Sequence, residues 1–257
     1  RYIMAYDHSM QRALLSLIRN SIKDYINSIS KIDIEIGSVC FIQRFGSGLN
    51  LNIHFHILIS EGGYYLNKRK RAKFLKIRPL VEDDINQILH DAILSTERLI
   101  RRKIESYKDL DKKEIDFYAD SIRNMISFGE RAGEFVRKLK EEESFDMPSR
   151  HKRPLLTKLV GFTLHADRRI KRRDRNSLKA LIRYMARPSV MEKDLSYENN
   201  EIKLKLKTPW KDGTDHLLFS PMEFIERLCA LIPRTYKNLI VYSGFMAPNS
   251  KIRKKVL

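Results

Sequence analysis

Apolar and polar residues alternate between residues 51 and 59, which is the pattern of a β-strand with one buried face. Successive side chains of a strand point to opposite faces, so one face here is entirely apolar. The apolar face carries Leu51, Ile53, Phe55, Ile57 and Ile59. The other face carries Asn52, His54 and His56. The pattern therefore predicts a strand that is anchored in a core and presents two imidazoles side by side.

A second strand is predicted directly before the first, over residues 36–45. The short segment 46–48, Gly-Ser-Gly, supplies a turn, so the two strands form an antiparallel hairpin. The Glu-Gly-Gly segment at 61–63 is expected to end the second strand, and residues 64–66 are expected to form a short further strand. Upstream, residues 9–28 have the apolar spacing of a helix.

The middle of the chain is predicted to be mainly helical. Residues 81–143 are densely charged with helical periodicity, which predicts two or three helices packed beside the sheet. Residues 144–154 contain two prolines and are predicted to form a loop. Residues 159–165 are predicted to form another strand.

An amphipathic helix is predicted over residues 177–187, capped by Asn176 or Ser177 and ended by Pro188. Its apolar positions fall at helical spacing and are expected to face a core, at Leu178, Leu181, Ile182 and Met185. The segments 202–207 and 216–219 are predicted to pair across a turn at 211–214. Ser220-Pro221 predicts the start of a helix over residues 221–232. These elements indicate one α/β (α+β) domain over residues 1–257, with a mainly antiparallel sheet and packed helices.

The charge balance points to a polyanionic partner, most often nucleic acid, because 50 Lys and Arg face 32 Asp and Glu, a formal net charge of +18. An anionic membrane surface and a merely solubilising surface are the alternatives. No apolar run of about 18 residues occurs, so membrane insertion is not expected. The two cysteines, Cys40 and Cys229, lie among apolar residues and are interpreted as small core residues. They cannot build a disulfide framework or a cysteine zinc cluster, and a reducing cytosolic setting is expected.

A metal site is the first chemical hypothesis. Gln43 precedes His54 by eleven positions on the preceding strand, so the hairpin is expected to place Gln43 opposite His54 on the same face. Two imidazoles and one amide oxygen from Gln43 would leave open positions for Mg²⁺ or Mn²⁺. The alternatives are two half-exposed histidines on a sheet surface and an ordinary polar strand residue.

Tyr184 is the candidate nucleophile. It flanks the apolar stripe of the predicted helix, near Arg183 and Arg187, and could equally be a packing residue. A phenol titrates near pH 10, so it needs help from a metal or a base.

Six further residues are weaker candidates. Trp210 could stack on a base or pack the turn, and Lys207 beside it is a candidate DNA contact. Arg44, Arg183 and Arg187 could contact phosphates or could be solvated charges. His165 could be a second group behind the metal ligands or a structural histidine.

Several ordered blocks of the chain resemble the rolling-circle insertion-sequence transposases, which are HUH endonucleases related to Helitron and plasmid-relaxase nucleases. The blocks are residues 42–59, 161–166, 181–188, 206–214, 220–228 and 242–249. The resemblance implies a ferredoxin-like core similar to RNA-recognition motifs. It also implies a function, in which single-stranded DNA is nicked and rejoined at transposon ends through a 5′-phosphotyrosine intermediate. His54, His56 and Gln43 would hold Mg²⁺ or Mn²⁺, and Tyr184 would be the nucleophile.

The chain departs from this family in two ways. Well-known members carry a second tyrosine four residues before the first, where this chain has Ala180, so a two-tyrosine cycle is in doubt. The family often begins with a cysteine-rich zinc module that is not found here, which suggests a catalytic part or a truncated copy. The resemblance implies a bacterial, cytoplasmic and nucleoid-associated protein, and leaves a homodimer open. The rival hypotheses are a non-catalytic DNA-binding protein derived from a transposase, and an unrelated metal hydrolase.

Overall fold

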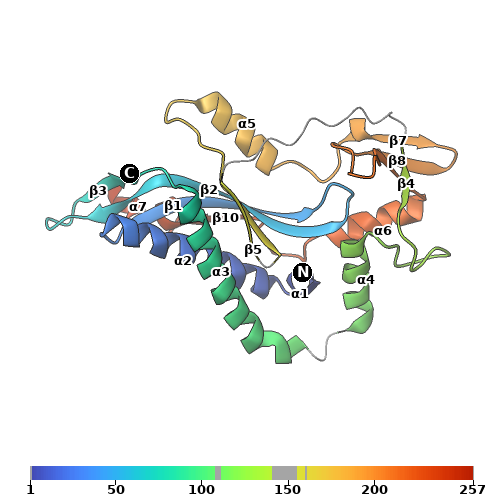
Figure 1. The fold of residues 1–257 in the computed structure, drawn as a ribbon, viewed down its shortest axis with the longest axis horizontal. Coiled ribbons are helices and arrows are strands. Elements are labelled where there is room, and N and C mark those ends of the chain that lie inside the picture. The colour runs from blue at the N-terminus through green and yellow to red at the C-terminus, as the bar shows by residue number, and fades with distance from the viewer. Residues whose placement is uncertain (1, 108–110, 141–154, 160, 257) are drawn as a thin grey trace.

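The computed structural model describes residues 2–107, 111–140, 155–159 and 161–256 (Figure 1). Helices combine with antiparallel sheets, which confirms the predicted α+β class. The predicted loop at 144–154 lies outside the described residues. Within them, none of the helices combines the length and the apolar character that crossing a bilayer requires.

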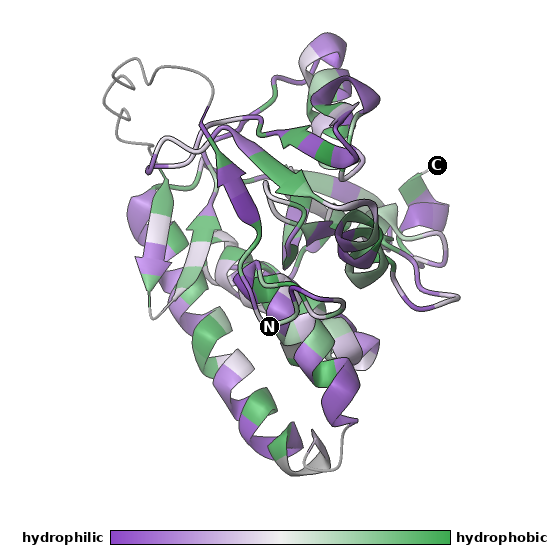
Figure 2. Ribbon diagram, turned by 90° about the vertical axis from the view of Figure 1, so that its right-hand side faces the viewer, coloured by the Kyte–Doolittle hydropathy of each residue, from purple (hydrophilic) through white to green (hydrophobic). Residues whose placement is uncertain are grey.

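The central sheet has the strand order β10-β1-β2-β3, and each neighbouring pair is antiparallel. Its strands are β1 (Glu35–Phe45), β2 (Leu51–Leu66), β3 (Ala72–Lys76) and β10 (Ile240–Ser243). The predicted hairpin is confirmed, since β1 and β2 pair from Glu35↔Tyr64 to Phe45↔Leu51. Hydrophobic and hydrophilic residues are mixed along both the strands and the helices (Figure 2).

The expected end of the second strand at 61–63 is wrong. β2 continues through the two glycines to Leu66. Its pairing with β1 shifts register between Ile36 and Ser38 of β1. Gly62 has φ 154°, and a Cβ at this position would lie 2.1 Å from the backbone oxygen of Leu75. The glycine therefore lets the strand pass close to β3, where a side chain would have no room.

The helices surround this sheet, and α2 and α5 lie on opposite sides of it (Figure 1). The α-helices are α1 (Tyr2–Tyr6), α2 (His8–Ser30), α3 (Glu82–Lys103), α4 (Lys112–Arg123), α5 (Arg175–Met185), α6 (Pro221–Leu231) and α7 (Arg253–Val256). Short 3₁₀ turns are η1 (Ile104–Tyr107), η2 (Glu192–Asp194) and η3 (Gly244–Met246). Cys40 is buried as predicted, but Cys229 is exposed, which corrects its interpretation as a core residue.

The helical prediction for residues 81–143 holds only in part. Asn124 adopts a left-handed conformation (φ 63°) and ends α4. The chain then runs irregularly to a strand, β4 (Arg137–Leu139), which pairs with β9 (His216–Phe219). Local charge and periodicity could not reveal this pairing, because the partner strand lies far along the sequence.

A second sheet has the order β4-β9-β8-β7 and shares the main core with the first. Its other strands are β7 (Leu195–Glu198), β8 (Glu201–Lys205) and β9 (His216–Phe219). The predicted pairing of residues 202–207 with 216–219 is confirmed for β8 and β9, where Lys205 faces His216. The buried side chains Leu204 and Phe219 belong to the same core cluster as Ile42.

The strand predicted at 159–165 is instead a hairpin of β5 (Leu156–Leu159) and β6 (Phe162–His165). Gly161 has φ 79°, a value that glycine adopts without steric cost, and it lies in the turn between them.

An ion pair ties the start of α3 to its surroundings. Asp84 is 3% exposed and accepts hydrogen bonds from Arg78, Tyr25 and the backbone amide of Val81. The hydrogen bonds from Arg78, above all, hold the pKa of the Asp84 carboxyl well below its usual range.

Candidate active site

The hairpin of β1 and β2 brings Gln43, His54 and His56 to one face of the sheet, the histidine face. Gln43 lies opposite His54, as the position of the hairpin turn predicted, and Phe41 lies opposite His56. The imidazole centroids of His54 and His56 are 4.9 Å apart, with their planes at 75°. The opposite face of β2 packs into the core through Leu51 and Ile53 and partly buried residues beyond them. The histidines therefore project from a firmly anchored strand.

His54 is prepared to offer a lone pair from Nε2, and His56 is uncharged. Nδ1 of His54 lies 2.8 Å from the carbonyl oxygen of Asn52, which can only accept, so Nδ1 carries the proton and Nε2 does not when the ring is neutral. Burial, together with the nearby His54 and Arg187, lowers the pKa of His56 to about 4. His56 is therefore neutral at physiological pH.

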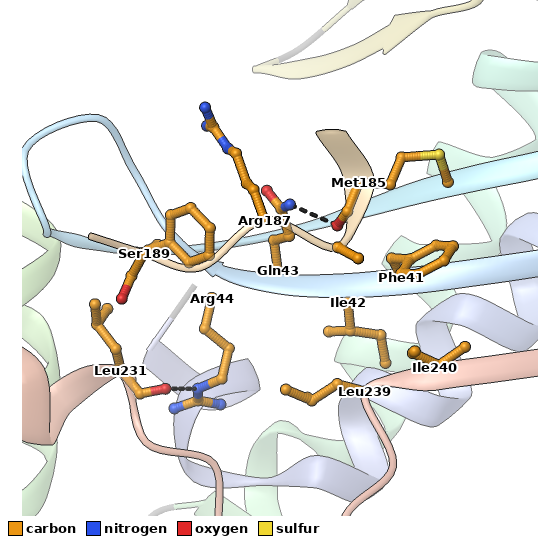
Figure 3. Close-up of a pocket in the computed structure, with 12 residues that line it drawn as sticks. Phe41, Ile42, Gln43, Arg44, Met185, Arg187, Ser189, Leu231, Leu239 and Ile240 are labelled. Atoms are coloured by element: carbon orange, nitrogen blue, oxygen red, sulfur yellow. Dashed lines mark hydrogen bonds between the residues drawn. The ribbon is translucent and has the colours of Figure 1, made fainter. Parts of the chain in front are cut away.

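Gln43 connects the histidine pair to helix α5. Its side chain is buried, at 4% exposure. Its amide oxygen lies 3.1 Å from Nε2 of His56, and its amide nitrogen donates to the carbonyl oxygen of Met185 over 2.7 Å. Figure 3 shows the second bond. Met185 is the last residue of α5 and directly follows Tyr184, so a single side chain spans the gap from strand to helix.

Helix α5 begins two residues earlier than predicted. Asp174, rather than Asn176 or Ser177, is the N-cap, and its carboxylate accepts from the backbone amide of Ser177 over 2.9 Å. The helix ends at Met185, before Pro188, as expected.

The expectation that the apolar stripe of α5 faces a core is wrong for most of its length. Met185 is the one residue of α5 that is buried, and Ile182 is 38% exposed. Local amphipathicity predicted the helix correctly, but how deeply a helix packs depends on distant segments.

Tyr184 lies at the histidine face. Its ring centroid is 5.8 Å from that of His56, and the side chain is 45% exposed. Two cations approach the ring: the Arg187 guanidinium carbon at 5.2 Å and the Lys207 ammonium at 5.1 Å. The structure thus brings together a phenol, two imidazoles, an amide oxygen and two positive charges from four separate segments.

The remaining candidate residues include Arg44, His165 and Arg183. Arg44 is 3% exposed, and its Nε donates to the carbonyl oxygen of Leu231 at the end of α6 over 3.0 Å. Arg44 is therefore not a surface phosphate contact, because its guanidinium binds the C-terminal end of helix α6 inside the protein. His165 pairs with Asp167 at 2.9 Å, which favours the structural interpretation. Arg183 is exposed on α5.

Trp210 packs the hairpin turn. A Cβ at Gly48 would lie 3.0 Å from the Trp210 ring, whose Nε1 is 3.4 Å from the Ser47 hydroxyl. Lys138 lies 5.1 Å from the ring centroid. Of the two alternatives, packing of the turn is the one that these contacts favour.

Sequence reasoning missed two features of the site. The bond from Gln43 to Met185 uses a backbone carbonyl, which leaves no signal in the residue pattern. Lys207 was weighed as a DNA contact, but the residue pattern did not show that its ammonium lies over the Tyr184 ring, because Lys207 and Tyr184 belong to separate segments.

The candidate metal ligands are two imidazole nitrogens and one amide oxygen. Among the described residues, no group of three or more His, Cys, Asp and Glu side chains could hold a metal ion, so Gln43 would have to complete any set with His54 and His56. Neighbouring ligand atoms of an octahedral ion, each bound at 2.0–2.1 Å, lie about 3 Å apart. The 3.1 Å between His56 Nε2 and Gln43 Oε1 agrees with this spacing. Nε2 of His56 and Oε1 of Gln43 are therefore spaced like two neighbouring ligands of such an ion.

A family model matches most of the chain. Residues 37–254 match the model of the family described as "Putative transposase". Because the match spans most of the chain, the protein belongs to this transposase family. No curated protein and no solved structure matches the chain.

Proposed function

We propose that this protein is a metal-dependent transposase of the HUH type that nicks and rejoins single-stranded DNA at transposon ends. The observation that carries the proposal is the position of Tyr184, which lies beside His56 and beneath the cations of Arg187 and Lys207. Membership of the transposase family supports it independently.

Tyr184 is the nucleophile in this proposal. Its phenolic oxygen attacks the scissile phosphorus and forms a new P–O bond, while the bond to the 3′ oxygen of the preceding nucleotide breaks. Tyr184 is partly exposed, so its proton can pass to water, and the leaving oxygen takes up a proton to become a free 3′-OH. The products are a 5′-phosphotyrosine and a 3′-OH. An ester bond is kept at each stage, so rejoining needs no ATP.

The surrounding side chains bind and orient the strand. Arg187 and Lys207 supply positive charge where a phosphate would lie against Tyr184, and Nε of Arg187 has no hydrogen-bond partner among the described residues. Gln43 holds the end of α5 against β1 and so fixes the distance between the phenol and the histidines. Mg²⁺ or Mn²⁺ held by His54, His56 and Gln43 would neutralise charge on the phosphate oxygens.

The test is adduct formation with a labelled single-stranded oligonucleotide from the transposon end, in the presence of Mn²⁺. We expect wild-type protein to form a covalent, SDS-resistant adduct and Tyr184→Phe to form none. Tyr197→Phe is the matched control, because Tyr197 is 62% exposed and its hydroxyl contacts only Asn200 among the described residues. Equal adduct from Tyr184→Phe would refute the assignment of the nucleophile.

The same assay tests the rival function. A non-catalytic DNA-binding protein would bind the oligonucleotide with strong salt dependence, yet form no adduct with or without Mn²⁺.

A further inference from the structure

A cavity of about 260 Å³ opens at the edge of β1, beside the histidine face (Figure 3). Its walls come from residues 41–45 of β1, from residues 185–187 and Ser189 after α5, and from Leu231 and the pair 239–240. None of the sequence motifs pointed to it, because these segments are brought together only by the fold.

The cavity exists because β10 is shorter than the strand it borders. β10 pairs with β1 only as far as Phe41↔Ile240, followed by one bond from the Ile42 amide to the Leu239 carbonyl. β1 itself continues to Phe45. The last residues of β1 therefore leave an edge that β10 does not cover, and the segment after α5 closes the space from above (Figure 3).

The walls combine aromatic surface with hydrogen-bond donors. Phe41 and Phe45 line the cavity, and the Arg187 guanidinium lies 5.6 Å from the Phe45 ring centroid. Arg44 is more than nine-tenths buried, and its Nη1 has no hydrogen-bond partner among the described residues. No carboxylate is among the lining residues. Such walls suit a flat, apolar group that carries hydrogen-bond acceptors and negative charge close by.

The cavity also lies next to the proposed chemistry. Gln43 lines it and, at the same time, contacts His56 and the carbonyl oxygen of Met185. Met185 lines it too, and directly follows Tyr184. A group in the cavity would therefore be a close neighbour of a phosphate held at Tyr184.

We propose that this cavity takes one nucleobase of the bound DNA strand, beside the phosphate that Tyr184 attacks, and that Arg44 donates to an exocyclic oxygen of that base. The inference rests on the proposed function for its DNA substrate. It adds a site of base selection, with Arg44 and the two phenylalanines as specificity-determining residues.

The test fills the cavity. Ser189→Phe places a ring in it, and Ser196→Phe places the same ring on the exposed face of β7 as a matched control. Each substitution is made in the Tyr184→Phe background, and the protein selects bound strands from a randomised single-stranded DNA library. We expect the bound pool to favour an oxygen-bearing base at one position, with the preference kept by Ser196→Phe and lost by Ser189→Phe.

A second measurement uses the selected oligonucleotide with that base removed. Loss of the base should weaken binding about tenfold in protein with an open cavity, the size expected of one stacked base, and should have no effect in Ser189→Phe. Ala186→Leu, which narrows the cavity from another position of the same segment, replaces Ser189→Phe if the latter does not fold. A base preference that survives both fillings, or no preference at all, would overturn the inference.

The two proposals fail separately. Base selection that depends on the open cavity, without any covalent adduct from otherwise unaltered protein, would leave the inference standing and refute the nuclease. Covalent adducts that form without any base preference would support the nuclease and refute the inference about the cavity.

Discussion

The substitution Gln43→Leu tests the link between the histidine strand and the tyrosine helix. Leucine is similar in volume to glutamine, so it leaves little cavity, but it lacks the amide oxygen and the amide nitrogen. The carbonyl oxygen of buried Met185 then loses its donor, and His56 loses its contact at 3.1 Å. A lost hydrogen bond that strands a buried polar group costs about 1–3 kcal/mol. We therefore expect the free energy of unfolding to fall by about 2 kcal/mol, which is about 30-fold in the folding equilibrium.

Urea denaturation followed by circular dichroism measures this loss. Gln87→Leu is the matched control, because Gln87 is exposed on α3 and surface changes of this kind usually stay within about 0.5 kcal/mol. Hydrogen exchange adds a local readout, and the amides of α5 should exchange faster in Gln43→Leu than in wild-type protein. If Gln43→Leu were as stable as Gln87→Leu, with α5 equally protected, the role assigned to Gln43 would be refuted.

Three further predictions concern the pH dependence of stability, metal binding and DNA binding. Folding lowers the pKa of Asp84, so its carboxylate stabilises the protein above its unfolded-state pKa of about 4 and loses this effect as the pH falls. In urea melts across pH, Asp84→Asn should be about 1–3 kcal/mol less stable at neutral pH, with the difference shrinking in acid; a constant difference would contradict this. Mn²⁺ at about 100 times its Kd should stabilise wild-type protein and the exposed control His90→Ala by about 2.7 kcal/mol in thermal melts, but not His54→Ala. Lys207→Gln should reduce the salt slope of single-stranded DNA binding by about 0.7, whereas the α4 surface variant Lys112→Gln should leave it unchanged.

The short-range part of this architecture could be predicted from the sequence. Alternation along β2 predicted which face carries His54 and His56, and the glycine turn fixed the register that puts Gln43 opposite His54. Both follow from the two-residue repeat of a strand, which is a local property. The helix that carries Tyr184 was likewise predicted within two residues at each end.

Long-range features could not be predicted in this way. Arg44 looked like a surface charge, yet it is buried against the end of α6, nearly two hundred residues away in the chain. The continuation of β2 through Gly62 depends on how closely β3 passes, and the strand β4 depends on pairing with β9. The HUH-type core that the resemblance implies stays a prediction.

The central claim is that Tyr184 becomes covalently joined to DNA. Peptide mass spectrometry of a digested adduct, formed with Mn²⁺ and trimmed with nuclease, measures this directly. The account predicts one modified peptide, with a 5′-linked nucleotide on Tyr184. A nucleotide found on any other residue, or on none in a preparation that cleaves DNA, would contradict it.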